Sequence, residues 1–402
     1  MTSPSPANPD PLDTSLTRAG VEAAHKLITP LIHLTPVLTN ATLDRLASTP
    51  RSASDLEGTE WAGRVPARPV LRFWFKCENF QKVGAFKARG AFHAIERLKQ
   101  TPGWEEGGGR ERGVVTHSSG NHAQALSLAA LASSIPAHII MPSTSTPSKI
   151  AATRTYSGRI TFSGPSPESR ASTTAHIQSL TRATFIPPYN HPHIILGAGT
   201  AALELLSQLP PQVSLNGIIT PCGGGGLLSG TALTCSTTPT LVFGAEPTFQ
   251  GADDCRRGLL SHTLIPDVHT TTIADGLRTP VGEIPWSIIH DRGLVRAVYG
   301  VSEADIKKAM RLVYERVKIV VEPSAVVGLA AALFNEEFRG VVEREGGEEG
   351  WDLGVIFSGG NVSLEALGGL LGEEGPGAGS GKGENGKGVD GKEDREADKL
   401  SV

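Results

Sequence analysis

The sequence of 402 residues has few cysteines and no long apolar run. Its four cysteines are far apart and form no Cys-x-x-Cys pair, which argues against a zinc finger and against a disulfide-framework protein. The longest apolar stretch, at 326–334, is much shorter than the roughly 18 residues that a membrane-spanning helix needs. We therefore expect a packed helix at 326–334 and no membrane partner.

An excess of positive charge is also absent. The 37 Lys and Arg residues are outnumbered by 41 Asp and Glu residues, giving a net charge of -4. Proteins that bind nucleic acids usually concentrate basic residues against the phosphates, so no nucleic-acid partner is expected. Residues 1–13 lack the apolar segment of a signal peptide. These absences predict a soluble cytoplasmic protein.

Glycine, in contrast, is abundant, with 47 residues in two groups. Nine of the twenty residues at 372–391 are glycine, mixed with Glu, Lys and Asp. Such a composition cannot bury enough apolar surface to offset the entropy of ordering, so the tail at 372–402 is predicted to be disordered. The glycines of the second group lie in turns within the apolar part of the chain.

Apolar runs typical of buried strands alternate with helical patterns between the termini, which predicts a parallel α/β fold. A polar stretch at 48–68 interrupts the pattern and predicts an inserted surface loop. The expected strands are 71–75, 113–116, 137–141, 159–162, 183–186, 217–220, 241–245 and 354–357. The expected helices are 86–98, 122–131, 147–156, 168–180, 199–206, 227–233, 303–317 and 324–334.

Ligands of parallel sheets bind at the carboxyl ends of the strands, and the first polar motif at such a position is GAFKARGA. It places Lys87 at the start of an expected helix, where the helix dipole disfavours a positive charge. A depressed pKa would favour the nucleophilic neutral amine. Taken alone, a solvated surface lysine is the simpler interpretation.

The second motif, THSSGNHA, also follows an expected strand. Its small polar residues present hydroxyls and main-chain N–H groups that suit an anion such as a carboxylate. A helix cap is the alternative, but a cap needs only one such residue. The polar residues concerned are Ser118, Ser119, Asn121 and His122.

The third motif, CGGGGLLSG, has four consecutive glycines before a helix: Gly223, Gly224, Gly225 and Gly226. Glycine lets the backbone wrap closely around a tetrahedral anion, so this turn indicates a phosphate site rather than a flexible turn. It is neither a Walker A motif nor a dinucleotide fingerprint.

The fourth motif, FSGGNV, puts the hydroxyl of Ser358 at the end of the last expected strand. An ordinary glycine turn explains this motif equally well. Together the motifs supply a reactive amine, a carboxylate site, a phosphate cradle and a hydroxyl. Pyridoxal 5′-phosphate, a phosphorylated carbonyl cofactor that condenses with a lysine, matches this set.

At this point the chain resembles the fold-type II pyridoxal-phosphate enzymes, and within them the serine racemases and serine/threonine dehydratases. The resemblance runs from about residue 20 to residue 367 through GAFKARGA, THSSGNHAQAL, CGGGGLLSG, IADGLRTPVG, VEPSAVVGLAAAL and FSGGNVSL. It implies a tryptophan synthase β-like α/β fold and a homodimer. The large domain, with a parallel twisted sheet, would comprise 1–112 and 183–371, and a smaller mobile α/β domain would comprise 113–182.

The resemblance also implies roles for the cofactor site. Lys87 would hold the cofactor as a Schiff base and act as the base at the substrate Cα, while Phe86 packs against the ring. Asn121 would bind the pyridoxal 3′-oxygen, and Ser358 the pyridine nitrogen. The phosphate would bind to Gly223, Gly224, Gly225 and Gly226.

For the substrate, the resemblance implies carboxylate binding by Ser118, Ser119, Asn121 and His122. Ser119 matches the serine that reprotonates Cα on the face opposite the lysine in serine racemases, and many dehydratases have alanine there. Arg170 and Thr279 match positions that line the substrate pocket.

A divalent cation, Mg²⁺ or Ca²⁺, would be coordinated by Glu246, the carbonyl of Ala252 and Asp254, in keeping with oxygen ligands for hard cations. An ordinary acidic loop is the alternative. The segment from Glu246 to Asp254 is longer here than in serine racemase.

The activity implied is racemisation of serine together with β-elimination from serine or threonine, giving D-serine, pyruvate or 2-oxobutanoate, and ammonia. A nucleotide effector fits the same resemblance. Two alternatives stay open. One is a threo-3-hydroxyaspartate ammonia-lyase, with a β-carboxylate beside Arg170 or Arg278. The other is a catalytically silent module that binds an amino acid or a nucleotide.

Overall fold

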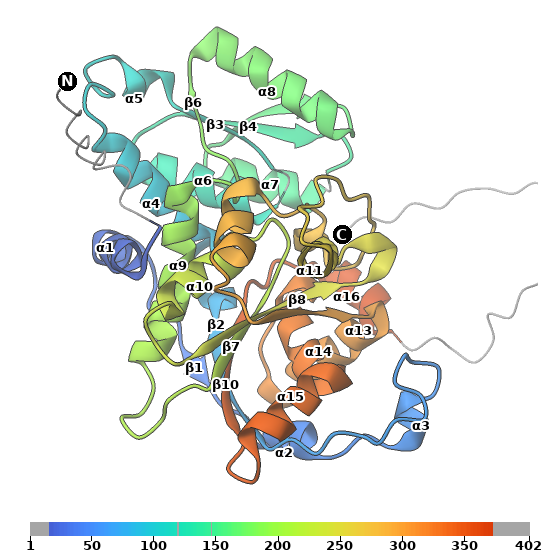
Figure 1. Ribbon diagram of the computed structural model, residues 1–402. Helices are drawn as coiled ribbons and strands as arrows, with labels where there is room; N and C mark the ends of the chain where they lie inside the picture. The colour runs from blue at the N-terminus through green and yellow to red at the C-terminus, as the bar shows by residue number, and fades with distance from the viewer. Residues whose placement is uncertain (1–15, 119, 146, 373–402) are drawn as a thin grey trace, which may run out of the picture.

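The structure is a computed structural model that describes residues 16–118, 120–145 and 147–372 (Figure 1). Among these residues the strands form a six-stranded sheet and a four-stranded sheet. The tail predicted at 372–402 lies outside the described residues except for Gly372, as do the first fifteen residues. The prediction of an α/β fold with mainly parallel sheets is confirmed.

The larger sheet has the strand order β1-β2-β10-β7-β8-β9, and β1 alone runs antiparallel, to β2. The smaller sheet has the order β5-β4-β3-β6 and is parallel throughout. The larger sheet comprises β1 (Val37–Leu38), β2 (Leu71–Cys77), β7 (Gly217–Pro221), β8 (Leu241–Pro247), β9 (Ala297–Val301) and β10 (Trp351–Phe357). The smaller comprises β3 (Val114–His117), β4 (Ala137–Pro142), β5 (Arg159–Ser163) and β6 (Thr184–Phe185).

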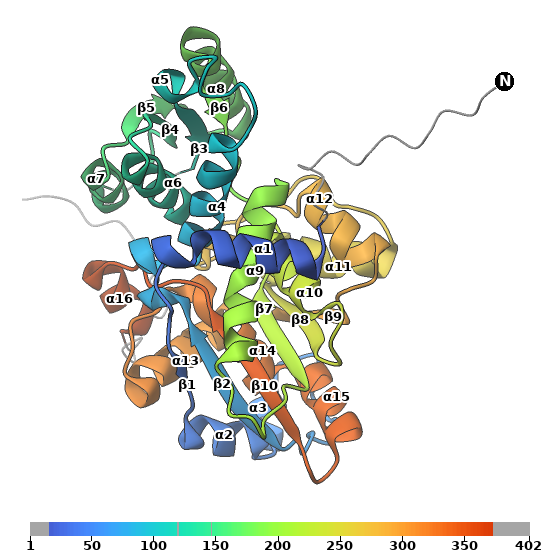
Figure 2. The same cartoon turned by 90° about the vertical axis from the view of Figure 1, so that its left-hand side faces the viewer.

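Helices cover both sheets, as expected where strands are joined by right-handed crossovers. The smaller sheet and its helices lie above the larger sheet in Figure 1, and Figure 2 shows α1 lying across α9. The helices are α1 (Arg18–Ile28), α2 (Ala41–Ser48), α3 (Ala53–Leu56), α4 (Lys87–Lys99), α5 (Gly109–Arg112), α6 (Asn121–Ala132), α7 (Pro147–Thr155), α8 (Pro167–Thr181), α9 (Pro192–Ser207), α10 (Gly226–Cys235), α11 (Asp254–Ser261), α12 (Glu283–Trp286), α13 (Glu303–Leu312), α14 (Val327–Phe334), α15 (Glu336–Gly346) and α16 (Leu364–Leu371).

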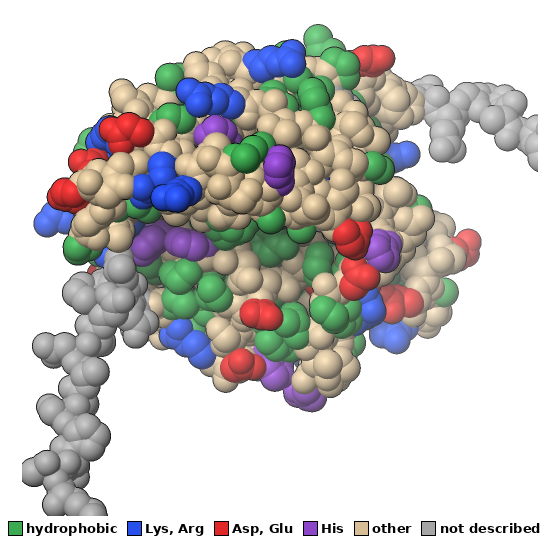
Figure 3. Space-filling model, turned by 90° about the horizontal axis from the view of Figure 1, so that it is seen from above, with side chains coloured by type: hydrophobic (Ala, Val, Ile, Leu, Met, Phe, Trp, Pro, Cys, Tyr) green, Lys and Arg blue, Asp and Glu red, His purple; other side chains and the backbone are tan. Residues whose placement is uncertain are grey.

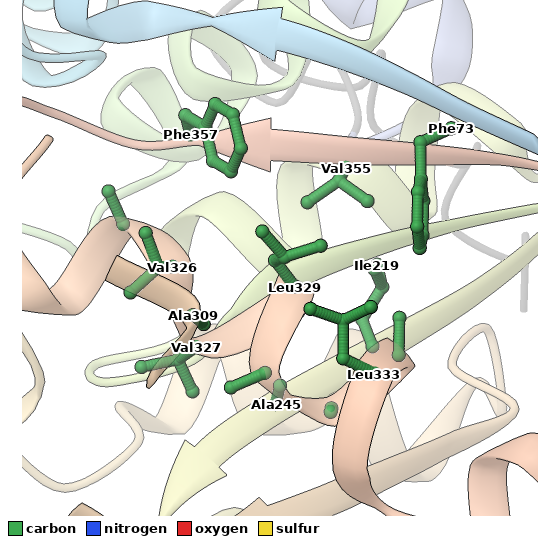
Figure 4. Packing of buried hydrophobic residues seen from close by; sticks show 14 of the residues in the cluster. Phe73, Ile219, Ala245, Ala309, Val326, Val327, Leu329, Leu333, Val355 and Phe357 are labelled. Atoms are coloured by element: carbon green, nitrogen blue, oxygen red, sulfur yellow. The ribbon is translucent and has the colours of Figure 1, made fainter. Parts of the chain in front are cut away.

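The core of the larger sheet lies against α14, the helix expected at 326–334. Leu329 and Leu333 of α14 point toward Ile219 of β7 and Val355 of β10 (Figure 4). Every strand residue of β7 is buried, and β10 is buried except for Asp352. Strands covered on both faces are apolar along their whole length, which is why the sequence shows continuous runs rather than alternation.

A buried ionic network holds α4 in place between the two sheets. Arg89, fully buried, donates to Glu78 from Nε at 2.6 Å and to Glu204 of α9 from Nη2 at 2.7 Å. Lys76 donates to the same Glu204 carboxylate at 2.7 Å. Burial opposes the charge of Arg89, but the two carboxylates outweigh it and raise its pKa. Because Lys87 precedes Arg89 by half a turn, the network also positions Lys87.

The segment at 48–68 differs from a plain surface loop. It contains α3, which begins with a capping box in which Ser52 and Asp55 each bond the other's main-chain N–H. Leu56, Trp61 and Ala67 are buried, and the N–H of Ala67 donates to the carboxylate of Glu336 in α15 at 2.8 Å. Most other residues of the segment are exposed, so its polar composition hides these buried positions.

No helix in the described part of the chain is long and apolar enough to cross a membrane. On the face seen from above, Lys and Arg side chains are scattered among Asp and Glu rather than gathered into one patch (Figure 3). That distribution agrees with the absence of a basic excess in the composition.

Candidate active site

A cavity of about 990 Å³ opens between the two sheets and is lined by residues from both. It lies where β3, β7 and β10 end, as expected for ligands of parallel sheets. The predicted site residue Ser119 lies outside the described residues. The other predicted cofactor and substrate residues all line this cavity: Phe86, Lys87, Ser118, Asn121, His122, Arg170, Gly223, Gly224, Gly225, Gly226, Thr279 and Ser358.

Lys87 is the first residue of α4, as its motif predicts. Its Nζ donates to the carbonyl of Pro188 at 2.7 Å and lies 5.0 Å from the centre of the Phe86 ring. Burial lowers the pKa of Lys87 to about 8, and the nearby carboxylate of Glu322 opposes this shift only in part. About a tenth of the amine is therefore neutral at pH 7, far more than for an ordinary lysine, and the neutral form is the one that attacks a carbonyl.

The glycine turn leads from β7 into α10 and exposes main-chain donors. Gly225 is the N-cap of α10, with φ +82°, which only glycine adopts without strain. No described residue accepts a hydrogen bond from the N–H groups of Gly223, Gly224 or Gly226. Since a helix N-terminus with free N–H groups binds anions, this turn suits the phosphate of the expected cofactor.

Close packing adds a second reason for glycine at this turn. A Cβ on Gly224 would lie 2.2 Å from the ring of Tyr189, and one on Gly223 would lie 2.9 Å from Cα of Leu277. The turn is therefore held between two other segments of the chain. A flexible turn, the alternative interpretation of the sequence, does not describe it.

Ser358 follows β10 directly and lies beside the first turn of α4. Its carbonyl accepts a hydrogen bond from the N–H of Phe86 at 3.0 Å, while no described residue bonds to its hydroxyl. The side chain is nearly buried yet borders the cavity. A hydroxyl left free in this way fits the expected contact with a ring nitrogen.

Asn121, the first residue of α6, is held by two residues that the sequence motifs did not assign a role. Its Nδ2 donates to Oε1 of Glu322 at 2.8 Å, and its Oδ1 accepts from Nδ2 of Asn361 at 2.8 Å. The same Glu322 carboxylate accepts the main-chain N–H of Asn361 at 3.1 Å. Burial raises the pKa of Glu322 to about 8, and Asp275 adds to the shift.

His122 is buried behind the cavity wall. Its Nε2 lies 3.2 Å from the carbonyl of Ile186, and burial lowers the pKa of His122 to about 3, so the ring is neutral. The main-chain N–H groups of Asn121 and His122 have no described acceptor. Ser118 follows β3, and its hydroxyl accepts a hydrogen bond from the N–H of Gly120 at 3.3 Å. This end of α6 thus offers N–H donors to an anion.

Arg170 of α8 reaches the cavity with a buried Nε that has no hydrogen-bond partner among the described residues. Arg278 also lines the cavity, but its guanidinium donates to the carbonyls of Thr271 and Thr272. Burial raises the pKa of the Tyr189 hydroxyl, and Thr279 lies close enough to Tyr189 to lower that pKa by a smaller amount. Among the described residues, Arg170 therefore has a buried donor without an acceptor, whereas the hydrogen bonds of Arg278 use its Nε and Nη2.

An ion pair crosses the mouth of the cavity between Lys149 of α7 and Asp275 of the short turn Asp275–Leu277. His117, at the end of β3, lines the same region and stacks on Phe185 with ring centres 5.3 Å apart. The sequence motifs include His117 and Asp275 without indicating these contacts. The His117–Phe185 contact lies within the smaller sheet, between β3 and β6, whereas the Lys149–Asp275 pair joins residues 126 positions apart in the sequence.

The expected cation residues lie outside the cavity. Glu246 is fully buried at the end of β8, and its two oxygens accept the N–H groups of Cys255 and Arg256 at 3.1 and 2.9 Å. Asp254 accepts the N–H of Val281 at 2.9 Å, and Ala252 is buried. Burial, with Cys255 and Asp254 nearby, raises the pKa of Glu246. The Sγ atoms of Cys222 and Cys255 lie within 4.8 Å of a Glu246 carboxylate oxygen. Binding of Mg²⁺ or Ca²⁺ by Glu246, the carbonyl of Ala252 and Asp254 stays a prediction.

Comparisons with known proteins identify relatives of this chain. Residues 59–345 match the family described as pyridoxal-phosphate dependent enzymes. The chain is 41% identical to serine racemase of Rattus norvegicus over 352 residues, which are 87% of this chain and 94% of the relative. It is 38% identical to beta-hydroxyaspartate dehydratase of Paracoccus denitrificans over 347 residues, which are 86% and 96% of the two chains. The solved structure of maize serine racemase, 38% identical, superposes with a TM-score of 0.74 over 87% of this chain and 95% of that chain.

Proposed function

The chain belongs to the family of pyridoxal-phosphate dependent enzymes, and we propose that it racemises serine and also catalyses β-elimination from serine and threonine. The observation that carries this proposal is the cavity that gathers the Lys87 amine, the free N–H groups of the glycine turn and the free Ser358 hydroxyl. Each of these groups matches one part of pyridoxal phosphate: its carbonyl, its phosphate and its ring nitrogen. When bound, this cofactor supplies a carbonyl for condensation with amines and an electron sink that acidifies Cα–H.

Lys87 and Ser119 are the proposed proton-transfer groups. The neutral Nζ of Lys87 accepts the Cα proton on one face of the substrate. The hydroxyl of Ser119, assigned from its sequence position, delivers a proton to the opposite face and so inverts the centre. The N–H groups of Asn121 and His122, which have no acceptor among the described residues, orient the substrate carboxylate.

A neutral hydroxyl at Ser358 supports racemisation and elimination over transamination. Unlike a carboxylate, a serine hydroxyl does not hold a pyridine nitrogen in its protonated form. The electron sink is weaker as a result. We therefore expect racemisation, in which a proton returns to Cα, and elimination, in which the β-hydroxyl leaves as water, to be faster than transamination.

Elimination from threo-3-hydroxyaspartate is the second candidate, favoured by one specific observation. The Nε of Arg170 is buried and has no hydrogen-bond partner in the described part of the chain, so it can donate to a substrate β-carboxylate. The similarity to the Paracoccus dehydratase agrees with this choice. With Arg278 already bonded to main-chain carbonyls, Arg170 is the residue we assign to that carboxylate.

One assay separates the candidates. The purified enzyme is incubated in turn with L-serine, L-threonine and threo-3-hydroxyaspartate, and both the keto acid and the D-isomer are measured. Formation of D-serine with some pyruvate supports the main proposal, whereas keto acid from hydroxyaspartate alone supports the second. In Ser119→Ala we expect D-serine formation to be lost and elimination to be largely kept. Equal loss of both activities would reject the role of Ser119.

A catalytically silent binding module would give different experimental results. A colourless protein that binds a nucleotide and yields no product would replace the enzymatic proposal. A visible absorption band that borohydride abolishes together with activity would support the enzymatic proposal.

We also expect the chain to form a homodimer and to respond to a nucleotide. Light scattering with and without ATP measures the molar mass and so tests both expectations.

A further inference from the structure

Two histidines that lie outside the cavity face each other from neighbouring elements. Nδ1 of His262 lies 3.2 Å from Nε2 of His290, and the two rings meet edge to face with their centres 5.5 Å apart. His262 directly follows α11, and His290 belongs to the π-helical turn Ser287–Asp291. Neither residue lines the cavity, so the proposed catalytic site does not account for this pair.

The ring of His290 is held by two neighbouring side chains. It stacks on the ring of Trp286, with the centres 4.7 Å apart and the planes 8° from parallel. Its Nδ1 lies 2.7 Å from Oδ1 of Asp291, and because a carboxylate oxygen only accepts, Nδ1 carries the hydrogen. In the neutral ring Nε2, the atom that faces His262, therefore presents a lone pair.

His262 has a backbone conformation that is unusual for a residue with a side chain. Its φ of 52° and ψ of 34° lie in the left-handed region, and its N–H caps α11 by donating to the carbonyl of Gly258. Glycine is the residue that suits such a helix end best. The backbone therefore does not explain why an exposed histidine stands at this position.

We propose that His262 and His290 bind a divalent transition-metal ion that prefers imidazole nitrogen, such as Zn²⁺ or Cu²⁺. At Zn–N bonds of about 2.0–2.1 Å, two nitrogen ligands in tetrahedral geometry lie about 3.3 Å apart. The two ring nitrogens are already 3.2 Å apart, so binding needs only a small rotation of the exposed His262 ring. Asp291 then takes the place of the carboxylate that commonly orients a metal-bound histidine through its other nitrogen.

Water completes the coordination of the ion. Among the described residues no third His, Cys, Asp or Glu side chain joins these two histidines at ligand distance. We therefore expect an exchangeable ion, because structural zinc sites have four protein ligands. Binding forms two metal–nitrogen bonds and displaces two waters of the hydrated ion. His262 then carries its hydrogen on Nε2, so the neutral pair releases no net proton.

An ion at this position would tie the end of α11 to a segment that packs against α10. Ile288 and Ile289, which precede His290, are buried in the same hydrophobic cluster as Leu227 and Leu228 of α10, the helix that the glycine turn begins. An ion that binds only the folded chain stabilises it. Zn²⁺ should therefore raise the unfolding temperature of the cofactor-loaded enzyme.

Isothermal titration calorimetry with Zn²⁺ tests the site without depending on catalysis. The cofactor-loaded enzyme is freed of transition metals, held at pH 8 in millimolar Mg²⁺ and titrated with ZnCl₂, so that any oxygen-ligand site is already filled. We expect the histidine pair to bind one Zn²⁺ per chain that Mg²⁺ does not displace. Cu²⁺ bound to the pair should show coupling to two imidazole nitrogens in its electron paramagnetic resonance spectrum.

Variants of the pair test which residues hold the ion. His262→Gln, His290→Gln and Asp291→Ala should each weaken Zn²⁺ binding at least about tenfold, as loss of a ligand or of its orienting partner does. His269→Gln is the matched control, because His269 is exposed and lies 3.0 Å from the carboxylate of Asp267 but is not one of the two facing histidines. It should bind Zn²⁺ like the parent.

His262→Gly separates loss of the ligand from loss of the fold. Glycine adopts the left-handed conformation at this helix end without strain, so the metal-free variant should unfold at the same temperature as the parent or higher. The rise in unfolding temperature on adding Zn²⁺ should nevertheless be lost. Far-ultraviolet circular dichroism and the visible cofactor band verify folding of every variant.

Three results would overturn the site and leave a plain hydrogen bond between the two rings. The first is a parent enzyme that binds no Zn²⁺ in the presence of Mg²⁺. The second is Zn²⁺ binding that His262→Gly and His290→Gln both retain, as expected if thiols or other histidines hold the ion. The third is a Cu²⁺ spectrum without coupling to two nitrogens. None of these measurements uses turnover, so failure here is distinguishable from failure of the proposed function.

Discussion

Asn121 donates a hydrogen bond from Nδ2 to Oε1 of Glu322 at 2.8 Å, joining the start of α6 to the segment that precedes the 3₁₀ turn Pro323–Val326. The amide oxygen of Asn121 accepts a hydrogen bond from Nδ2 of Asn361, so the orientation of the Asn121 side chain is fixed. One N–H of the amide remains for a ligand in the cavity. A buried carboxyl thus sets the direction in which a cavity residue can donate.

Glu322→Gln is expected to change how stability depends on pH. The folded-state pKa of about 8 lies above the ordinary value of 4.5, so the folded protein holds this proton more tightly than the unfolded chain. The contribution of Glu322 to stability is therefore complete below pH 4.5 and is lost as pH rises toward 8, by up to about 1.4 kcal/mol per pH unit. Gln keeps an acceptor for Asn121 and cannot ionise, so the variant should lose less stability than the parent between pH 5.5 and 8.

Calorimetric unfolding temperatures of the cofactor-loaded enzyme at several pH values measure this difference. Glu337→Gln is the control, since Glu337 is an exposed carboxylate of α15 and should leave the pH dependence unchanged. Parallel curves for Glu322→Gln and the parent would show that Glu322 does not carry a raised pKa in the folded enzyme.

Lys87→Ala should abolish turnover, with a loss of at least about a hundredfold, because a positioned proton-transfer group contributes that much or more. The visible cofactor band should shift or disappear as well. Lys82→Ala is the matched control, because Lys82 lies only five residues before Lys87 but its Nζ sits over the ring of Phe92, 5.4 Å from its centre. Rates of pyruvate and D-serine formation measure both variants, and retained turnover in Lys87→Ala would refute the assigned chemistry.

Local signals were sufficient to predict the parts of the site that lie within one motif. The starts of α6 and α10 were predictable because Asn121 and the glycine turn follow apolar strands within a few residues, and the start of α4 because Lys87 lies in a distinct motif after β2. The α/β class followed from the same alternation. By contrast, β1 has two residues and leaves no pattern, and the polar sequence of α15 concealed a helix whose buried face includes Phe338 and Arg339.

The contacts that tune the site could not be predicted, because their partners are far apart along the chain. Glu322 and Asn121 are separated by 201 residues, and Asn361 and Asn121 by 240. Glu322 was visible in the motif VEPSAVVG, but only tertiary packing shows that it is buried beside Asn121. The same holds for Arg278, which sequence reasoning offered as a ligand for a β-carboxylate although its guanidinium bonds to main-chain carbonyls.

Gly224→Ala should weaken cofactor binding through packing and not through charge. The added Cβ would lie 2.2 Å from the Tyr189 ring, so either the ring or the glycine turn must move. A displaced turn no longer aims its N–H groups at a phosphate. Cofactor affinity, measured by the recovery of visible absorbance on titration, should fall at least tenfold, roughly the effect of one lost charged hydrogen bond. Gly368→Ala in α16, where a Cβ would meet nothing within 4 Å, should leave affinity unchanged.

Arg170→Met tests whether the free guanidinium recognises a β-carboxylate. A hydrogen bond to a charged group contributes about 1.5–3 kcal/mol, so kcat/KM for threo-3-hydroxyaspartate should fall roughly tenfold to a hundredfold. Serine has no β-carboxylate, so its kcat/KM should fall much less, and the ratio between the two substrates is the decisive quantity. Arg154→Met is the control, since Arg154 is an exposed arginine of the neighbouring helix α7. An unchanged ratio in Arg170→Met would assign the β-carboxylate to another cation of the cavity, and Lys149 would then be tested next, because its pairing with Asp275 can be exchanged for a ligand anion.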